Sequence, residues 1–181
     1  MRITRLAAFV LTVAAFAAMS SGCGYALAGR GNTLPPGIVT IGIPAFINQS
    51  VIGGIDRVLT EAVTVEFQTK GKYRVLPQAE GVDAVLTGRV VNVTSVPVAF
   101  TANNVESRRA IIVTAAIEFR EVGADRTIWA NPSFQVRDEF EVATGATATD
   151  AAAILTKNTD ALERLSKVFA RSVVTSIFEA F

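Results

Sequence analysis

Hydrophobic positions along the chain fall into three spacing patterns, and the first is a short uninterrupted run near the N-terminus. From Leu6 to Met19 the sequence is apolar except for one threonine; two arginines precede this run and three small residues follow it. At about 14 residues the run is too short to span a bilayer and has the usual length of a signal-peptide core. We therefore expect residues 1–22 to be a signal peptide that is removed from the mature protein.

Two segments show the second pattern, the spacing of an amphipathic helix. Between Ile52 and Lys70 an apolar residue recurs every four positions, and Gly71 follows where a helix commonly ends. A longer segment from about Asp150 to the C-terminus carries a similar apolar stripe. Asp160–Arg164 and Glu163–Lys167 have the spacing of i,i+4 ion pairs on this helix. The stripes predict two helices, each with one face in the core. Their expected inner residues are Ile55, Leu59, Val63, Phe67, Ile154, Asn158, Ala161, Leu162, Leu165, Val168, Phe169, Val173 and Ile177.

The third pattern is apolar runs and alternation with the period of a β-strand. Residues 38–46 are nearly all apolar and β-branched, which predicts a buried strand. Residues 83–100, 111–119 and 127–142 predict three longer strands, and residues 73–76 the start of a short one. The alternation changes parity near Val90 and Val91, and we expect a β-bulge or a segment covered on both faces there. Asn131 and Pro132 predict a break or bulge in the last strand.

These elements predict an α+β fold in the order β-α-β-β-β-α. We expect two helices packed on one face of a mixed, mainly antiparallel four-stranded sheet, with the other face partly exposed or covered by a partner. Residues 38–181 are expected to form this single periplasmic domain, and residues 23–37, which are rich in glycine and proline, to form an extended tether.

Cys23 is the only cysteine, and it follows the small residues at the end of the predicted signal peptide. This position predicts cleavage before Cys23 and attachment of lipid to its thiol, although Ser20 replaces the large aliphatic residue that usually stands three positions before the lipidated cysteine. Two or three acyl chains hold a protein stably on a bilayer. Gly24 rather than aspartate follows, so we expect anchorage in the outer membrane, facing the periplasm.

Composition narrows the chemistry. The chain has no histidine and no second cysteine, so it lacks the commonest general base, transition-metal ligand and nucleophile. A Ser–Lys or carboxylate-pair enzyme stays open as an alternative, but no motif indicates one, and we expect no enzymatic activity, no cofactor and no metal site. With 17 basic and 16 acidic residues the chain has no excess of positive charge, which argues against nucleic-acid binding.

One basic feature deserves separate treatment. Arg108 and Arg109 are adjacent beside a predicted polar turn at residues 101–107, and Arg137 lies in the following strand. Ordinary surface charge explains them, but guanidinium groups also recognise phosphate or carboxylate on an anionic partner. Glu139 and Glu141 alternate with apolar residues and are expected on the solvated face of their strand.

Taken together, the residues resemble the lipopolysaccharide-assembly lipoprotein family, with the elements in the same order over nearly the whole mature chain. The segments that carry the resemblance are Cys23-Gly24-Tyr25, Leu34-Pro35, Thr40–Pro44 with Phe46 and Asn48, Gly71–Val75, Ala84–Val90, and Ile128-Trp129 with Asn131.

The resemblance implies a plug within an outer-membrane β-barrel that, with this partner, inserts lipopolysaccharide into the outer leaflet. It also implies lipopolysaccharide binding through basic residues near one end of the sheet. In this chain the surroundings of Thr101 and the loop 144–149 are uncharged. Arg108, Arg109 and Arg137 are therefore the candidate binding residues.

A second interpretation is a periplasmic activator of cell-wall synthases or a curli-secretion-type lipoprotein, whose domains share the style of residues 73–93. Tether length separates the two. Cys23 and Ile38 are 15 residues apart, which allows at most about 50 Å, whereas reaching the cell wall calls for a longer linker. The short tether favours a domain that stays at the membrane.

Overall fold

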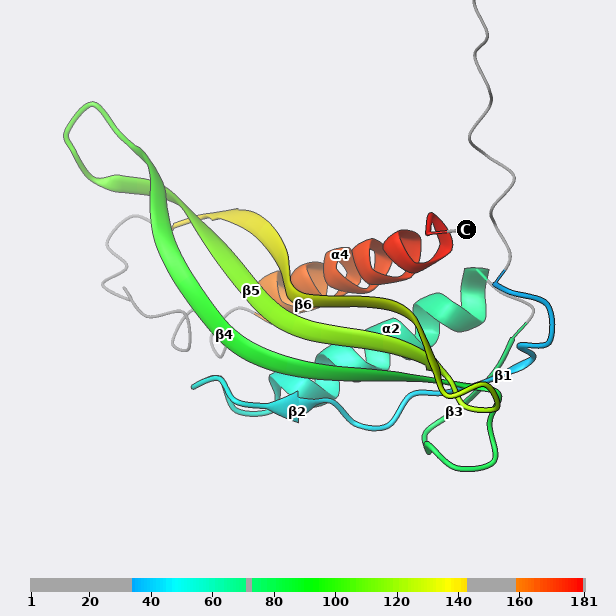
Figure 1. Cartoon of the computed structure of the whole chain (residues 1–181). Helices are drawn as coiled ribbons and strands as arrows, with labels where there is room; N and C mark the ends of the chain where they lie inside the picture. Colours follow the sequence, from blue (N-terminus) through cyan, green and yellow to red (C-terminus); the bar gives the residue numbers. More distant parts are fainter. Residues whose placement is uncertain (1–33, 71–72, 143–158, 181) are drawn as a thin grey trace, which may run out of the picture. The chain divides into compact units, whose positions relative to one another are not determined.

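The computed structural model describes residues 34–70, 73–142 and 159–180, which lie within one compact unit, Gly31–Phe181 (Figure 1). The predicted signal peptide, Cys23 and the tether up to residue 33 lie outside the described residues. So do the loop at 144–149 and the expected start of the last helix near Asp150. None of the described helices has both the length and the apolar character that crossing a membrane requires.

The described chain forms two helices and a six-stranded mixed sheet. Five strands are in the order β3-β1-β4-β5-β6, and β2 pairs with β4. The α+β class, the two helices and the mixed sheet are confirmed. The expected four strands and the order β-α-β-β-β-α are wrong, because two further short strands are present. The elements are β1 (Thr40–Gly42), β2 (Ile47–Asn48), α2 (Ile55–Lys70), β3 (Arg74–Leu76), β4 (Ala84–Phe100), β5 (Glu106–Glu121), β6 (Arg126–Glu141) and α4 (Thr159–Phe178).

The run at residues 38–46 was expected to be one strand, and a change of register ends that strand at Gly42. In β1, Gly42 pairs with Val85, whereas in β2 Ile47 pairs with Arg89, so the intervening segment carries one residue more than β4. Pro44 has no N–H to donate. The N–H of Phe46 donates to Thr60 Oγ1 of α2 at 3.0 Å rather than to a neighbouring strand. Residues 38–46 therefore contain only β1, and β2 follows them on the same edge of β4.

The predicted mixed, mainly antiparallel character of the sheet is confirmed. β1 runs parallel to β3 and to β4, and β4, β5 and β6 pair antiparallel. The register of β4 against β5 shifts between Val90 and Asn92, so the bulge predicted near Val91 is present. The register of β6 against β5 shifts between Asn131 and Phe134, around Pro132, as predicted for the last strand.

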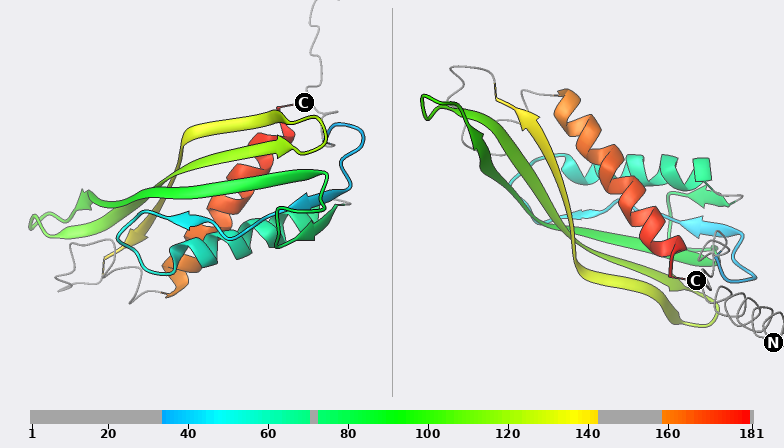
Figure 2. Two further views of the ribbon diagram at one scale, coloured as in Figure 1. Left: turned by 60° about the horizontal axis from the view of Figure 1, so that its bottom comes forward. Right: turned by 90° about the horizontal axis from the view of Figure 1, so that it is seen from above.

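Both helices lie on the same side of the sheet (Figure 2). On α2 the four predicted inner residues are fully buried, and on α4 Leu165, Phe169, Val173 and Ile177 are buried as expected. Aromatic rings connect the helix layer to the sheet. The ring centroids of Phe67 in α2 and Phe119 in β5 are 6.2 Å apart, and those of Phe169 in α4 and Phe134 in β6 are 5.9 Å apart. Burying such side chains contributes about 1.5–3 kcal/mol each. The helix-facing surface of the sheet is therefore the core, and its opposite surface is available for contacts.

Candidate functional site

The three arginines predicted as a site lie on two different faces of the sheet. Side chains alternate along a strand, so neighbours such as Arg108 and Arg109 must point to opposite sides. Arg109 points toward the helix side and is 4% exposed, whereas the Arg108 side chain is 54% exposed on the other side. The structure therefore does not bring all three together.

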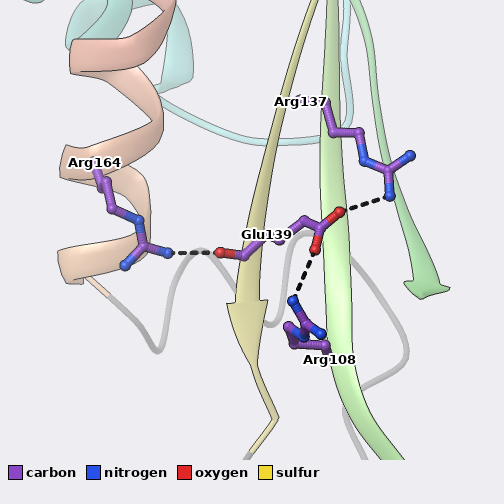
Figure 3. A network of polar contacts seen from close by, with 4 residues as sticks. All are labelled: Arg108, Arg137, Glu139 and Arg164. Atoms are coloured by element: carbon purple, nitrogen blue, oxygen red, sulfur yellow. Dashed lines mark hydrogen bonds and ion pairs between the residues drawn. The ribbon is translucent and has the colours of Figure 1, made fainter. Parts of the chain in front are cut away.

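It does bring Arg108 and Arg137 together on the exposed face. The pairing of β5 with β6 places both beside Glu139, and the two guanidinium groups share its carboxylate (Figure 3). Arg108 Nη1 lies 3.4 Å from Glu139 Oε2, and Arg137 Nη2 lies 2.8 Å from Glu139 Oε1. Glu139 lies on the solvated face of its strand, as predicted.

A third arginine reaches the same stretch of β6 from the helix layer. Arg164 of α4 donates to Asp138 Oδ2 at 2.9 Å and to the carbonyl oxygen of Glu139 at 3.2 Å. The sequence predicted a pair with Asp160 instead, because spacing within one helix cannot show that β6 passes beside α4. The other predicted pair, Glu163 with Lys167, forms at 2.5 Å.

Arg108 and Arg137 stand with Glu139 and Glu141 on the exposed face, and Arg164 pairs with Asp138 from the helix side, so the charges of the cluster balance. Exposed ion pairs of this kind contribute only about 0–1 kcal/mol, so the guanidinium groups can exchange Glu139 for another anion at little cost. The planar guanidinium fork matches phosphate and carboxylate oxygens in pairs. The arrangement can therefore bind an anionic group on the exposed face.

Arg109 contacts two residues of the β4–β5 hairpin, Ser95 and Glu106. Its Nε donates to Ser95 Oγ at 2.9 Å, its Nη2 lies 3.4 Å from the Ser95 carbonyl oxygen, and its Nη1 pairs with Glu106. These contacts fix the side chain against the inner face of the two strands. Its predicted role in ligand binding stays a prediction, and its observed contacts support the hairpin.

Other polar side chains in the described residues serve local structure. Thr40 and Val39 donate to the carboxylate of Asp83, and these hydrogen bonds lower its pKa. A hydrogen bond from Lys167 lowers the pKa of Glu163. Within the described ranges, no three histidine, cysteine or acidic residues are grouped closely enough to hold a metal ion.

Comparison with known sequences gives one match and one negative result. The family model described as LptE, lipopolysaccharide-assembly, matches residues 38–177. This match begins just before β1 and ends within α4, so it includes the whole sheet and both helices. The search of curated proteins returned no match.

Comparison with solved structures gives matches at low sequence identity. The hypothetical protein CT253 from Chlamydia trachomatis superposes with a TM-score of 0.51 at 7% identity, covering 78% of this chain and 96% of that one. Lipoprotein B from Nitrosomonas europaea gives 0.48 at 11% identity, with 83% and 88% covered. The rare lipoprotein B from Shewanella oneidensis gives 0.43 at 9% identity, with 76% and 95% covered. The first of these shows a common fold.

Proposed function

Because the chain belongs to the lipopolysaccharide-assembly family LptE, we propose that it is a lipid-anchored outer-membrane protein that works with a β-barrel translocon to assemble lipopolysaccharide at the outer leaflet. The match over residues 38–177 is the observation that carries this proposal, because it includes every described strand and nearly all of the last helix. The role is one of binding and plugging rather than catalysis.

The exposed arginines supply a contact for the ligand. Lipopolysaccharide carries phosphate groups, and Arg108 and Arg137 present two half-exposed guanidinium groups on adjacent strands. The arginines are held by a single shared carboxylate, which an incoming phosphate can replace. Arg164 holds Asp138 and the backbone of Glu139 from the helix layer and so fixes the strand on which Arg137 stands. We therefore assign Arg108 and Arg137 to ligand contact and Arg164 to positioning.

The anchor limits where this domain works. Leu34 is buried, and its backbone N–H donates to Tyr73 Oη at 2.9 Å, so the chain is already attached to the domain at this residue. If Cys23 carries the lipid, the free tether spans no more than residues 23–33, or at most about 40 Å fully extended. Such a reach keeps the domain against the inner surface of its membrane, as a barrel plug requires.

The activator of cell-wall synthases or curli-secretion-type lipoprotein remains the alternative role. Depletion of the protein from the bacterium that makes it separates the two. The proposal predicts that newly made lipopolysaccharide fails to reach the cell surface and accumulates in the inner membrane, and that a plasmid copy restores export. Normal surface lipopolysaccharide together with reduced cell-wall synthesis would contradict the proposal and support the alternative.

A further inference from the structure

The β4–β5 hairpin extends past the ends of the strands on either side of it. On one side β2 makes its last pairing with Val90, and on the other β6 makes its last pairing with Arg108. Between these positions β4 and β5 pair only with each other within the described part of the chain (Figure 1). We call residues 91–105 the hairpin arm.

The arm is free of charge, and several of its apolar side chains face solvent. No Asp, Glu, Lys or Arg lies between Arg89 and Glu106. Val96, Phe100 and Val105 are 37%, 54% and 48% exposed. Leaving this much apolar surface uncovered is unfavourable and commonly marks an interaction site.

The arm also has an open backbone edge. In a strand, alternate residues direct their N–H and C=O groups to either side. The side of β4 away from β5 is occupied up to Val90, whose carbonyl oxygen accepts from the N–H of Gln49 at 2.8 Å. From Asn92 to Val96 the register with β5 is regular and no described strand pairs with the far side, although Arg109 Nη2 lies 3.4 Å from the Ser95 carbonyl oxygen. Natural edges of this kind normally carry charged residues that prevent pairing with another chain.

We propose that the Asn92–Val96 edge of β4 binds an extended, uncharged segment of a partner protein as an added strand. A strand is the partner that satisfies a row of backbone donors and acceptors, whereas acyl chains cannot. The bulge at Val91 and Pro97 limit the ladder to these five residues. Charge complementarity also requires an uncharged partner, since a charge buried against this arm would remain unpaired.

The base of the arm argues against an anionic lipid surface as the occupant. Arg108, Arg109 and Arg137 stand there with Glu106, Glu139 and Glu141, three charges of each sign, so the local charge is balanced rather than positive. The proposal does not require that the partner be the barrel.

Hydrogen exchange tests the proposal directly. The full-length lipidated protein is purified from native membranes with the proteins that accompany it, and alone after those proteins are removed. An isolated hairpin is marginally stable, so the arm should exchange quickly in the protein alone. In the assembly we expect alternate amides from Asn92 to Val96 to exchange roughly tenfold or more slowly.

Lysine substitutions on this edge of β4 provide the test variant, and a lysine elsewhere in the arm provides its matched control. Thr94→Lys with Val96→Lys should abolish the protection and reduce recovery of the partner, whereas Val105→Lys, in the turn between β4 and β5, should preserve both. Unchanged exchange in the assembly, protection caused by a second copy or by lipid, or recovery of the protein without any partner would each overturn the proposal. Protection of the edge by a partner other than the barrel would support strand addition and contradict the proposed function. Recovery of the barrel without protection of the edge would support the proposed function and contradict strand addition.

Discussion

The carboxylate of Asp83 accepts two hydrogen bonds from Thr40, one from its backbone N–H and one from its Oγ1, both at 2.7 Å. In return, the N–H of Asp83 donates to Thr40 Oγ1 at 3.0 Å and to the Thr40 carbonyl oxygen at 3.1 Å. Thr40 begins β1, and Asp83 immediately precedes β4. This reciprocal pair therefore holds β1 against β4 at the start of their parallel pairing, where the two strands contribute few ladder hydrogen bonds.

The pair predicts a pH-dependent contribution to stability. The hydrogen bonds lower the pKa of Asp83 below its ordinary value of 3.8, so their stabilisation is fully present above that value. It is lost as the pH falls through 3.8 toward the lower pKa of the folded state. We expect Asp83→Asn to be less stable than the wild type at neutral pH and the difference to shrink in acid. Urea unfolding at several pH values measures this.

Asp125→Asn is the control for that series. Asp125 is 81% exposed and forms an ion pair with Arg120 at the β5–β6 turn, so its removal should change stability little at any pH. A pH-independent difference between Asp83→Asn and the wild type would contradict the assignment.

Close packing of Phe46 against Gly88 predicts a second effect. A Cβ atom on Gly88 would lie 2.7 Å from the Phe46 ring, closer than carbon atoms approach each other. We expect Gly88→Ala to destabilise the domain by about 1–3 kcal/mol because the ring or the strand must move. Gly123→Ala is the matched control, since nothing lies within 4 Å of its added methyl group. Thermal unfolding of the two variants compares them, and equal melting temperatures would be inconsistent with the packing described.

The exposed arginines predict a loss of ligand affinity without a loss of stability. Removing both side chains in Arg108→Ala with Arg137→Ala should weaken lipopolysaccharide binding roughly tenfold or more, since hydrogen bonds to charged groups contribute about 1.5–3 kcal/mol each. Titration calorimetry with purified lipopolysaccharide measures the affinity.

The control is Arg120→Ala with Arg126→Ala. These arginines are also exposed and also paired with carboxylates, but they lie at the β5–β6 turn. Equal losses of affinity in the two double variants would show only a general effect of charge.

For Arg109 we expect the opposite outcome, a loss of stability. Its side chain is buried and holds Ser95 and Glu106, so Arg109→Ala leaves polar groups of the hairpin without their partner. We expect a loss of about 1–3 kcal/mol in the free energy of unfolding. Arg108→Ala, at the neighbouring exposed position, should unfold like the wild type. Chemical denaturation of the two single variants measures the free energy of unfolding. An unchanged free energy of unfolding in Arg109→Ala would refute the structural role of Arg109.

Sequence periodicity predicted the long elements because each buries one continuous face. Alternation at residues 111–119 and the four-residue spacing from Ile55 to Phe67 required no knowledge of neighbours. The short strand β2 was not predicted, since two residues leave no measurable period, and β3 was predicted only as the start of a strand at residues 73–76. Their identity depends on pairing with β4 and β1, which lie far away in the sequence.

The candidate site was predicted only in part, because some of its contacts also depend on elements far apart in the sequence. Arg108 and Arg137 were identifiable as basic residues in neighbouring strands, and Arg109 was grouped with them by adjacency in sequence. Strand alternation alone could have separated Arg109 from Arg108. The contribution of Arg164 could not be predicted, because it depends on the approach of α4 to β6 at Asp138.

Partnership with a barrel is the central claim, and affinity purification of the full-length tagged protein from native membranes tests it most directly. The account predicts that a lipopolysaccharide-assembly barrel is recovered in near-equal amount with the protein, and that a tagged unrelated lipoprotein does not recover it. Recovery of cell-wall synthases without any outer-membrane barrel would contradict the account.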